Sequence, residues 1–123
     1  MGDSTCKILC ASIFLVLISQ GYSQCSLKDL SVTQQRTGAK VEGKPEFSVT
    51  ITNKCACVQT NVKLTCHDFK TVEAIDSSKF LAISEDSCLV NGGQPIYRDP
   101  ISFKYAWDQP YQLNPISSQI ACS

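Results

Sequence analysis

The chain has 123 residues, of which 43% are hydrophobic, and its 11 Lys and Arg residues balance 11 Asp and Glu residues. A chain of zero net charge lacks the surplus of Lys and Arg with which nucleic-acid-binding and polybasic membrane-surface proteins contact phosphate groups, so we expect no nucleic acid as a partner. The length fits one domain and is too short for a nucleotide-binding enzyme fold, which leaves a compact module as the carrier of any function.

The first element in the chain is a hydrophobic run that follows a positive charge. Lys7 precedes an apolar stretch over residues 8–18. Eleven residues are too few to span a bilayer, and their length is typical of the central region of a signal peptide. A buried core helix is the alternative interpretation of this stretch.

The residues that follow the hydrophobic run predict a cleavage site. Gly21 and Ser23 are small and occupy the two positions that a signal peptidase reads. We therefore predict a signal peptide over residues 1–23, cleaved between Ser23 and Gln24. The remaining residues, 24–123, form a secreted domain that does not insert into a membrane after processing.

Alternating apolar and polar residues predict β-strands along most of this domain. The clearest alternation runs from Phe47 to Thr52 and from Ile101 to Asp108, where every second side chain is hydrophobic. Shorter stretches with the same period are residues 30–33, 62–66 and 116–122. Clusters of Gly, Pro and Asn separate the runs and predict turns between them.

One segment favours a helix, and it is short. Asp76 or Ser77 can cap one or two helical turns that extend to Leu81. Several short strands at regular spacing otherwise predict an all-β fold. We expect a single domain, a disulfide-stabilised β-sandwich of short antiparallel strands with at most one short helical turn.

The secreted domain contains six cysteines, an even number that predicts three disulfides in an oxidising compartment. These residues are Cys25, Cys55, Cys57, Cys66, Cys88 and Cys122. Six cysteines allow 15 pairings, and although a bridge between Cys55 and Cys57 would be strained, the connectivity stays open. Cys66 and Cys122 fall on the apolar side of their strands, which predicts buried sulfur atoms and disulfides that tie the two sheets together.

A metal site is the competing interpretation of the cysteines. The spacing of Cys55 and Cys57 is one residue short of the usual zinc pattern. His67, the one histidine of the chain, directly follows Cys66 and adds no separate ligand at a typical distance along the sequence. We therefore expect neither a metal nor any other cofactor.

The histidine and the acidic residues form no recognisable catalytic pattern. Asp68 follows His67, but neighbours on a strand point to opposite faces, so we do not expect the two side chains to be preassembled. Asp76, Glu85 and Asp86 lie in turn-like sequence, where carboxylates are usually solvated rather than paired as in a glycosidase. We expect that the protein is not an enzyme.

One strand and one loop are the candidate binding surfaces. Residues 103–107 concentrate aromatic side chains whose inward parity favours a place in the core, although the last of them can reach the rim. Residues 91–97 form a polar, Gly-rich loop that is either a contact surface or a plain hairpin turn. The candidate partner-binding residues are Asn91, Gly92, Gln94, Tyr97 and Trp107.

Two motifs and the end of the chain form a specific combination. The motifs are Cys-Leu-Val-Asn-Gly-Gly-Gln-Pro over residues 88–95 and Phe-Lys-Tyr-Ala-Trp over residues 103–107, and the chain ends in Ala-Cys-Ser over residues 121–123. This combination resembles the plant family of tapetum determinant proteins, and the resemblance covers nearly all of the chain after the signal peptide. Tyr-Ala-Trp at residues 105–107 and the Cys55 and Cys57 pair look more like the broad homologue branch than the founding ligand.

The resemblance implies a small signalling protein of the plant apoplast. The best-known members of the family act as ligands for leucine-rich-repeat receptor kinases in cell-fate specification during anther development. The implied partner is therefore the extracellular domain of such a kinase, with or without a co-receptor, and we expect a monomer whose rigid surface docks on it. The alternative that the residues leave open is a cell-wall carbohydrate-binding module without catalysis, in which Trp107, Tyr97 or Tyr111 stacks on sugars.

Overall fold

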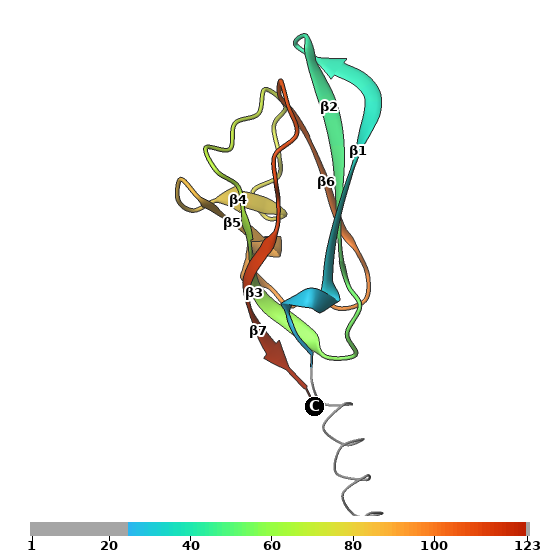
Figure 1. Cartoon of the computed structure of the whole chain (residues 1–123), viewed down its shortest axis with the longest axis vertical. Helices are drawn as coiled ribbons and strands as arrows, with labels where there is room; N and C mark the ends of the chain where they lie inside the picture. Colours follow the sequence, from blue (N-terminus) through green and yellow to red (C-terminus); the bar gives the residue numbers. More distant parts are fainter. Residues whose placement is uncertain (1–24, 123) are drawn as a thin grey trace, which may run out of the picture.

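The computed structural model describes residues 25–122, which form two antiparallel sheets (Figure 1). One sheet has the strand order β1-β2-β6, with β1 at Leu30–Val41, β2 at Lys44–Asn53 and β6 at Ile101–Ala106. The other has the order β4-β5-β3-β7, with β3 at Val58–Thr65, β4 at Phe80–Ala82, β5 at Ser87–Val90 and β7 at Pro115–Ala121. The two layers confirm the all-β, disulfide-stabilised sandwich of antiparallel strands.

The proposed leader lies outside the described part of the chain. The signal peptide over residues 1–23 and its cleavage between Ser23 and Gln24 therefore stay predictions. Within residues 25–122, no helix is long and apolar enough to cross a membrane.

The strands bury their apolar side chains between the sheets, as their periodicity predicts. Val49 and Ile51 of β2 are fully buried and belong to the same core cluster as Leu64 of β3, which is also fully buried. The ring of Tyr105 in β6 lies in the same core, with its centroid 5.3 Å from that of Phe47. Each such side chain stabilises the fold by about 1.5–3 kcal/mol relative to an exposed one, so this shared core holds the two layers together.

Strand β1 is much longer than the alternation over residues 30–33 predicts. Its second half is polar and exposed, so it carries no hydrophobic period, yet it pairs with β2 as far as Val41. A two-residue turn makes this pairing possible, because Glu42 and Gly43 both have positive φ, at 49° and 80°, as the tight turn of a twisted hairpin requires. An irregularity in the register between Arg36 and Lys40 interrupts the strand pair.

The helix predicted from Asp76 to Leu81 is wrong. Asp76 does cap this segment, because its Oδ1 accepts a hydrogen bond from the backbone N–H of Ser78 at 2.9 Å. The chain then makes one turn and enters β4, which places the ring of Phe80 in the core, stacked on Phe103 with centroids 4.3 Å apart. Helical geometry within residues 25–122 is confined to two 3-10 turns, η1 at Leu27–Asp29 and η2 at Asn91–Gly93.

The six cysteines form three disulfides, as their even number predicts. The pairs are Cys25–Cys55, Cys57–Cys122 and Cys66–Cys88. The first bridge joins the segment before β1 to the segment after β2. The second joins segments next to β3 and β7, and the third joins the segment after β3 to β5. Every bridge therefore links neighbours of one sheet. The prediction that Cys66 and Cys122 tie the two sheets together is wrong, because Cys122 follows the edge strand β7 and is exposed rather than buried in the core.

Two buried amide side chains connect the sheets instead. Asn53, at the end of β2, donates hydrogen bonds to the carbonyl oxygens of Cys57 and Ile96, both at 2.9 Å. Gln59 of β3 donates to Asn53 Oδ1 at 3.2 Å and accepts from the Ser118 hydroxyl of β7 at 2.7 Å. Asn53 is 2% exposed and Gln59 is fully buried, so these polar groups depend on one another for hydrogen bonds.

The network predicts a large effect of Gln59→Met, which keeps the length of the side chain and removes its amide. We expect a loss of about 1–3 kcal/mol in the free energy of unfolding, because the Ser118 hydroxyl and Asn53 each lose a buried partner. Urea unfolding measures the difference. The matched control is Gln35→Met on exposed β1, for which we expect a change within about 0.5 kcal/mol; equal losses in the two variants would contradict the role of the network.

Candidate functional site

The loop predicted as a contact surface is a compact structure held by its own hydrogen bonds. Asn91 begins η2 with a φ of 57°, and its backbone N–H donates to the carbonyl of Lys79 at 2.8 Å. Gly93 has a φ of 79°, and a Cβ at this position would lie 2.8 Å from Oδ1 of Asn61. Glycine is therefore required where the loop passes over β3.

The end of this loop is attached to β3 and leaves polar and aromatic groups exposed. The backbone of Ile96 pairs with that of Gln59 through hydrogen bonds of 2.8 and 3.3 Å, and its side chain is buried. The neighbouring side chains of Gln94 and Tyr97 are exposed, and Tyr97 has 62% of its surface accessible. The structure thus brings Asn91, Gly92, Gln94 and Tyr97 together on one firmly held loop.

Trp107 does not join this loop. It follows β6, whereas Tyr97 precedes β6, so the whole strand separates the two side chains. The ring of Trp107 is half-buried, with Nζ of Lys44 5.3 Å from the ring centroid and paired with Asp108. The five candidate residues therefore occupy two separate surfaces. The length of the strand predicted between Tyr97 and Trp107 could have indicated this separation.

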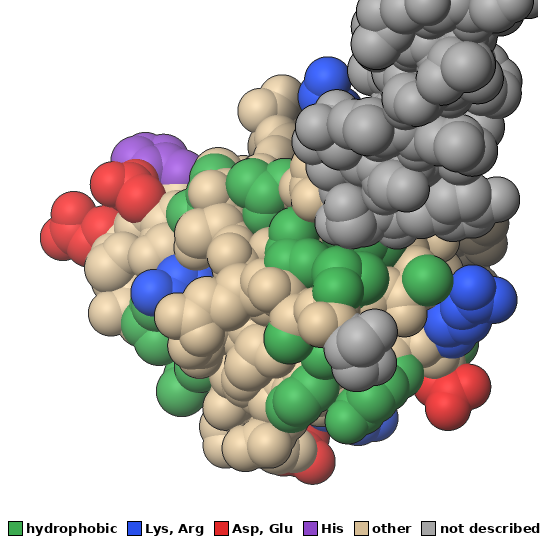
Figure 2. Space-filling model, turned by 90° about the horizontal axis from the view of Figure 1, so that it is seen from below, with side chains coloured by type: hydrophobic (Ala, Val, Ile, Leu, Met, Phe, Trp, Pro, Cys, Tyr) green, Lys and Arg blue, Asp and Glu red, His purple; other side chains and the backbone are tan. Residues whose placement is uncertain are grey.

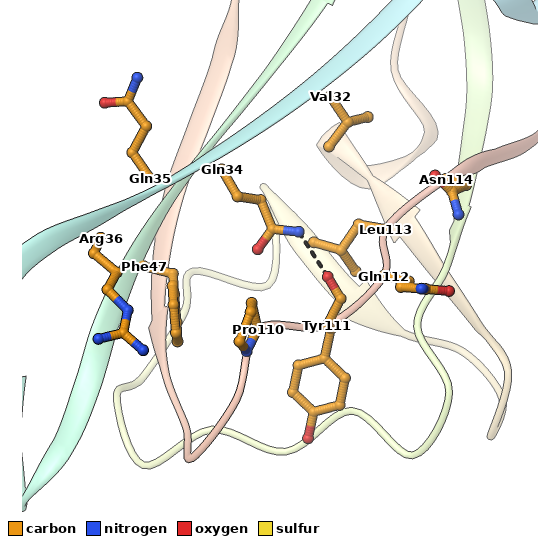
Figure 3. A pocket seen from close by; sticks show the side chains of 10 residues that line it. All are labelled: Val32, Gln34, Gln35, Arg36, Phe47, Pro110, Tyr111, Gln112, Leu113 and Asn114. Atoms are coloured by element: carbon orange, nitrogen blue, oxygen red, sulfur yellow. Dashed lines mark hydrogen bonds between the residues drawn. The ribbon is translucent and has the colours of Figure 1, made fainter.

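A cleft that the sequence did not reveal opens between β1 and residues 110–114 (Figure 3). It has a volume of about 730 Å³. Its lining consists of Val32, Gln34, Gln35 and Arg36 from β1, Phe47 from β2, and Pro110, Tyr111, Gln112, Leu113 and Asn114. Amides, one guanidinium and two aromatic rings make this a mixed polar and apolar surface.

Three hydrogen bonds form a closed ring that joins the two walls of the cleft. The Tyr105 hydroxyl donates to Oε1 of Gln34 at 2.5 Å, and Nε2 of Gln34 donates to the carbonyl of Tyr111 at 2.7 Å. The backbone N–H of Tyr111 donates back to the Tyr105 hydroxyl at 2.9 Å. Burial raises the pKa of Tyr105, so the hydroxyl keeps the proton that it donates to Gln34.

His67 and Asp68 contact each other, contrary to the sequence-based expectation. Nε2 of His67 lies 3.2 Å from Oδ2 of Asp68, and Nδ1 lies 2.6 Å from Oδ1 of Asp86. The expectation failed because β3 ends at Thr65 and Asp68 adopts a φ of 49°, so these residues form a turn rather than a strand. Figure 2 shows the histidine beside acidic side chains at the rim of the molecule, and with 79% of its side chain accessible it faces solvent rather than a cavity.

These acidic neighbours predict the titration of His67. The hydrogen bond that the His67 ring donates to the Asp86 carboxylate, together with the charge of Asp68, raises the pKa of His67 above its ordinary 6.5. The resulting stabilisation is present below the unfolded-state pKa and is lost as the pH rises through the folded-state pKa. We expect NMR titration to give a pKa above 6.5 that Asp86→Asn lowers, because the largest cause is removed.

Glu85→Gln is the matched control for this titration. Glu85 acts on His67 through charge alone and is the smallest cause of the raised pKa. We therefore expect a smaller change than with Asp86→Asn. A pKa at or below 6.5 in the wild-type protein, or an equal response to both substitutions, would contradict the assignment.

A pair of carboxyl groups also escaped the sequence analysis, because its members are far apart in the chain. Glu73 lies close to Glu46 of β2. Burial raises the pKa of Glu73, whereas the Thr37 hydroxyl, which donates to Glu46 at 2.7 Å, lowers the pKa of Glu46. One carboxyl group can thus keep a proton while its neighbour is charged. The pair places the segment between β3 and β4 beside β2.

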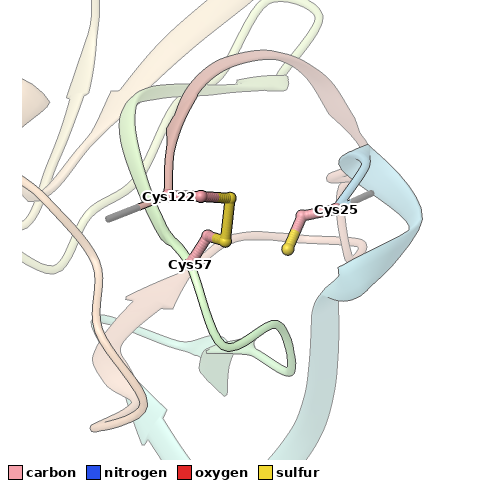
Figure 4. A group of neighbouring side chains, drawn as sticks. All are labelled: Cys25, Cys57 and Cys122. Carbon is pink, nitrogen blue, oxygen red and sulfur yellow. A yellow bond between two sulfur atoms is a disulfide. The ribbon is translucent and has the colours of Figure 1, made fainter. Parts of the chain in front are cut away.

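Clusters of sulfur atoms at the lower end of the sandwich resemble a metal site in their spacing alone. The sulfur atoms of Cys25, Cys57 and Cys122 lie within 4.8 Å of one another (Figure 4). In a second group, the sulfur atoms of Cys25 and Cys55 and a carboxylate oxygen of Asp29 also lie within 4.8 Å of one another. Every one of these sulfur atoms belongs to a disulfide. A metal needs the thiolate form of cysteine, so neither group fits one while the bridges are intact.

Comparison with known proteins places the whole sandwich in one sequence family. The sequence model described as Tapetum determinant 1, C-terminal, matches residues 26–123. TPD1 protein homolog 1B of Oryza sativa subsp. japonica is 33% identical over 100 residues, which cover 80% of this chain and 58% of that protein. TPD1 protein homolog 1 of Arabidopsis thaliana is 32% identical over 93 residues, which cover 73% of this chain and 52% of that protein.

A second rice relative is more distant. TPD1 protein homolog 1A of Oryza sativa subsp. japonica is 28% identical over 95 residues, which cover 70% of this chain and 42% of that protein. The chain therefore spans about half the length of the curated relatives that it matches. No solved structure matches the chain significantly.

Proposed function

The chain belongs to the plant tapetum determinant 1 family, and from this premise we propose that it is a secreted, non-enzymatic signalling protein. Its receptor in this proposal is the extracellular domain of a leucine-rich-repeat receptor kinase. The observation that carries the proposal is the family match over residues 26–123, which covers both sheets and every disulfide cysteine except Cys25. The name of the family points to the tapetum, so we propose a role in cell-fate specification during anther development.

The architecture supports a function in recognition. Three disulfides and a shared core keep the sandwich in one conformation, so docking on a receptor would cost little conformational entropy. A neutral, disulfide-linked domain of this size suits the apoplast, where thiols are readily oxidised. We propose that the protein acts there as a monomer.

The loop of residues 91–97 is the proposed receptor contact. It exposes the ring of Tyr97 on a backbone that η2 and the pairing of Ile96 with Gln59 hold in place. Exposed tyrosines on a preorganised loop are frequent anchors of protein interfaces, because they bury a large area with few rotatable bonds. Gln94 is exposed on the same loop and offers a hydrogen-bonding amide.

The carbohydrate-binding alternative gains no support from the aromatic side chains on which it depends. The ring of Tyr111 packs edge-on against Phe69 with centroids 4.8 Å apart, so it belongs to the aromatic cluster of the core. One face of Trp107 interacts with Lys44, and Tyr97 lies beyond the opposite end of β6. These rings are separated rather than arranged as one platform for a sugar chain.

Binding of residues 24–123 to a panel of leucine-rich-repeat receptor ectodomains, measured by surface plasmon resonance, tests this proposal. We expect one ectodomain to bind, and Tyr97→Ala to weaken that binding about tenfold or more, as the loss of an interface anchor does. Gln109→Ala, an exposed position beyond the other end of β6, is the matched control and should leave binding nearly unchanged. Failure of the wild-type protein to bind any ectodomain would count against the receptor role.

Secretion is tested separately, by expressing the full chain in plant cells. We expect the protein in the medium with an amino terminus at Gln24 or its cyclised form, as determined by mass spectrometry. The physical reason is the short hydrophobic run over residues 8–18, which a signal peptidase site follows. A secreted product that retains Leu15 would overturn the proposed cleavage.

A further inference from the structure

Strand β1 is an edge of its sheet, and its pairing with β2 shows which backbone groups are left outward. The carbonyl of Asp29 accepts a hydrogen bond from the N–H of Lys54 at 2.8 Å. The register continues from this pair, so Ser31 and Thr33, two and four residues further along, also direct their backbone groups toward β2. In an antiparallel pair, residues whose backbone groups bond to the partner strand alternate with residues whose groups face away from it. The alternate residues of β1 therefore present their backbone N–H and C=O groups at the free edge of the sheet.

The outward-facing residues are Val32, Gln34 and Arg36, and all three line the cleft. Among the backbone hydrogen bonds that residues 25–122 make outside their paired strands, none involves these three residues. Figure 3 shows the side chains of Gln34 and Arg36 directed into the cleft and that of Gln35 directed away from it, as the alternation of a strand requires. An unpaired strand edge thus forms one wall of the cleft.

Arg36 adds a positive charge to this wall. Its guanidinium carbon lies 5.8 Å from the centroid of the Phe47 ring, which also lines the cleft. The ion pairs formed within residues 25–122 do not include Arg36. The guanidinium therefore has its hydrogen-bond donors available for a carboxylate from another molecule.

The opposite wall is held at a constant distance from the edge. Gln34 bonds to the carbonyl of Tyr111, and the Tyr105 hydroxyl bonds to both residues. Gln112 and Asn114 in the same segment are exposed and border the cleft. A ligand would therefore enter a preformed site with amide groups on one side and a strand edge on the other.

We propose that this cleft binds an extended peptide segment that carries a carboxylate, which adds as a strand to the free edge of β1. The backbone groups of Val32, Gln34 and Arg36 repeat every second residue, about 6.8 Å apart, as an added strand requires. Arg36 selects the acidic side chain. An acidic polysaccharide also supplies carboxylates, but its hydroxyl groups do not reproduce the alternating donors and acceptors of a strand.

This site belongs to different elements from the loop of residues 91–97, so it does not depend on the proposed receptor contact. Selection from a phage library of random peptides on residues 24–123 provides the probe. We expect the selected peptides to be enriched in Asp and Glu. In NMR spectra, a synthetic copy of a selected peptide should shift the amide signals of Val32, Gln34 and Arg36.

Charge reversal tests the role of Arg36. We expect Arg36→Glu to weaken binding of the selected acidic peptide about tenfold, because a charged hydrogen-bonded pair is replaced by two like charges. The matched control is Arg98→Glu on another exposed loop, which should leave the affinity nearly unchanged. Both positions are exposed, so both variants should keep the wild-type NMR pattern in the core.

The backbone contribution is tested by Val32→Pro, which removes one outward N–H. We expect weaker peptide binding in a protein whose core spectrum shows that it is folded. The proposal is wrong if no peptide is selected, if a selected peptide shifts amide signals elsewhere, or if Arg36→Glu and Arg98→Glu behave alike. Binding of an oligogalacturonide at these residues in place of any peptide would also overturn it.

Discussion

The buried contact between the amide side chains of Asn53 and Gln59 determines how the two sheets are placed relative to each other. Hydrophobic packing between sheets is not directional, and each of the three disulfides joins neighbours within one sheet. The amides supply the missing direction, because each has polar atoms that must find partners without water. Through the carbonyl oxygens of Cys57 and Ile96, this contact also positions a disulfide and the loop of residues 91–97.

The Tyr105 hydroxyl applies the same principle to the cleft. Its hydrogen bonds with Gln34 and Tyr111 join β1 to the segment that precedes β7, so the cleft is a built part of the sandwich. The aromatic cluster around Tyr105 supports these bonds from the core side, with the ring of Phe69 5.3 Å away. Polar networks in an apolar surrounding are specific, because a misplaced partner leaves an unsatisfied group.

The two surfaces that this framework presents are suited to recognition rather than chemistry. One is a firmly held loop with an exposed tyrosine, and the other is an open strand edge beside Arg36. His67 serves structure, because it joins two turns at the end of one sheet through its contacts with Asp68 and Asp86. A member of a signalling family needs such a stable shape, and the six cysteines of a small domain provide it.

The sequence by itself determined the all-β class, the inward faces of β2 and β6, and the presence of three disulfides, because alternation and an even cysteine count are local properties of the chain. It did not reveal the polar half of β1, and it indicated a helix at Asp76, since propensity cannot sense that Phe80 is required in the core. Only the tertiary structure decided the cysteine pairs, the contact of His67 with Asp86 and the cleft beside Gln34. Each of these joins residues that are distant in the chain, and their meeting depends on how two sheets pack rather than on any local pattern.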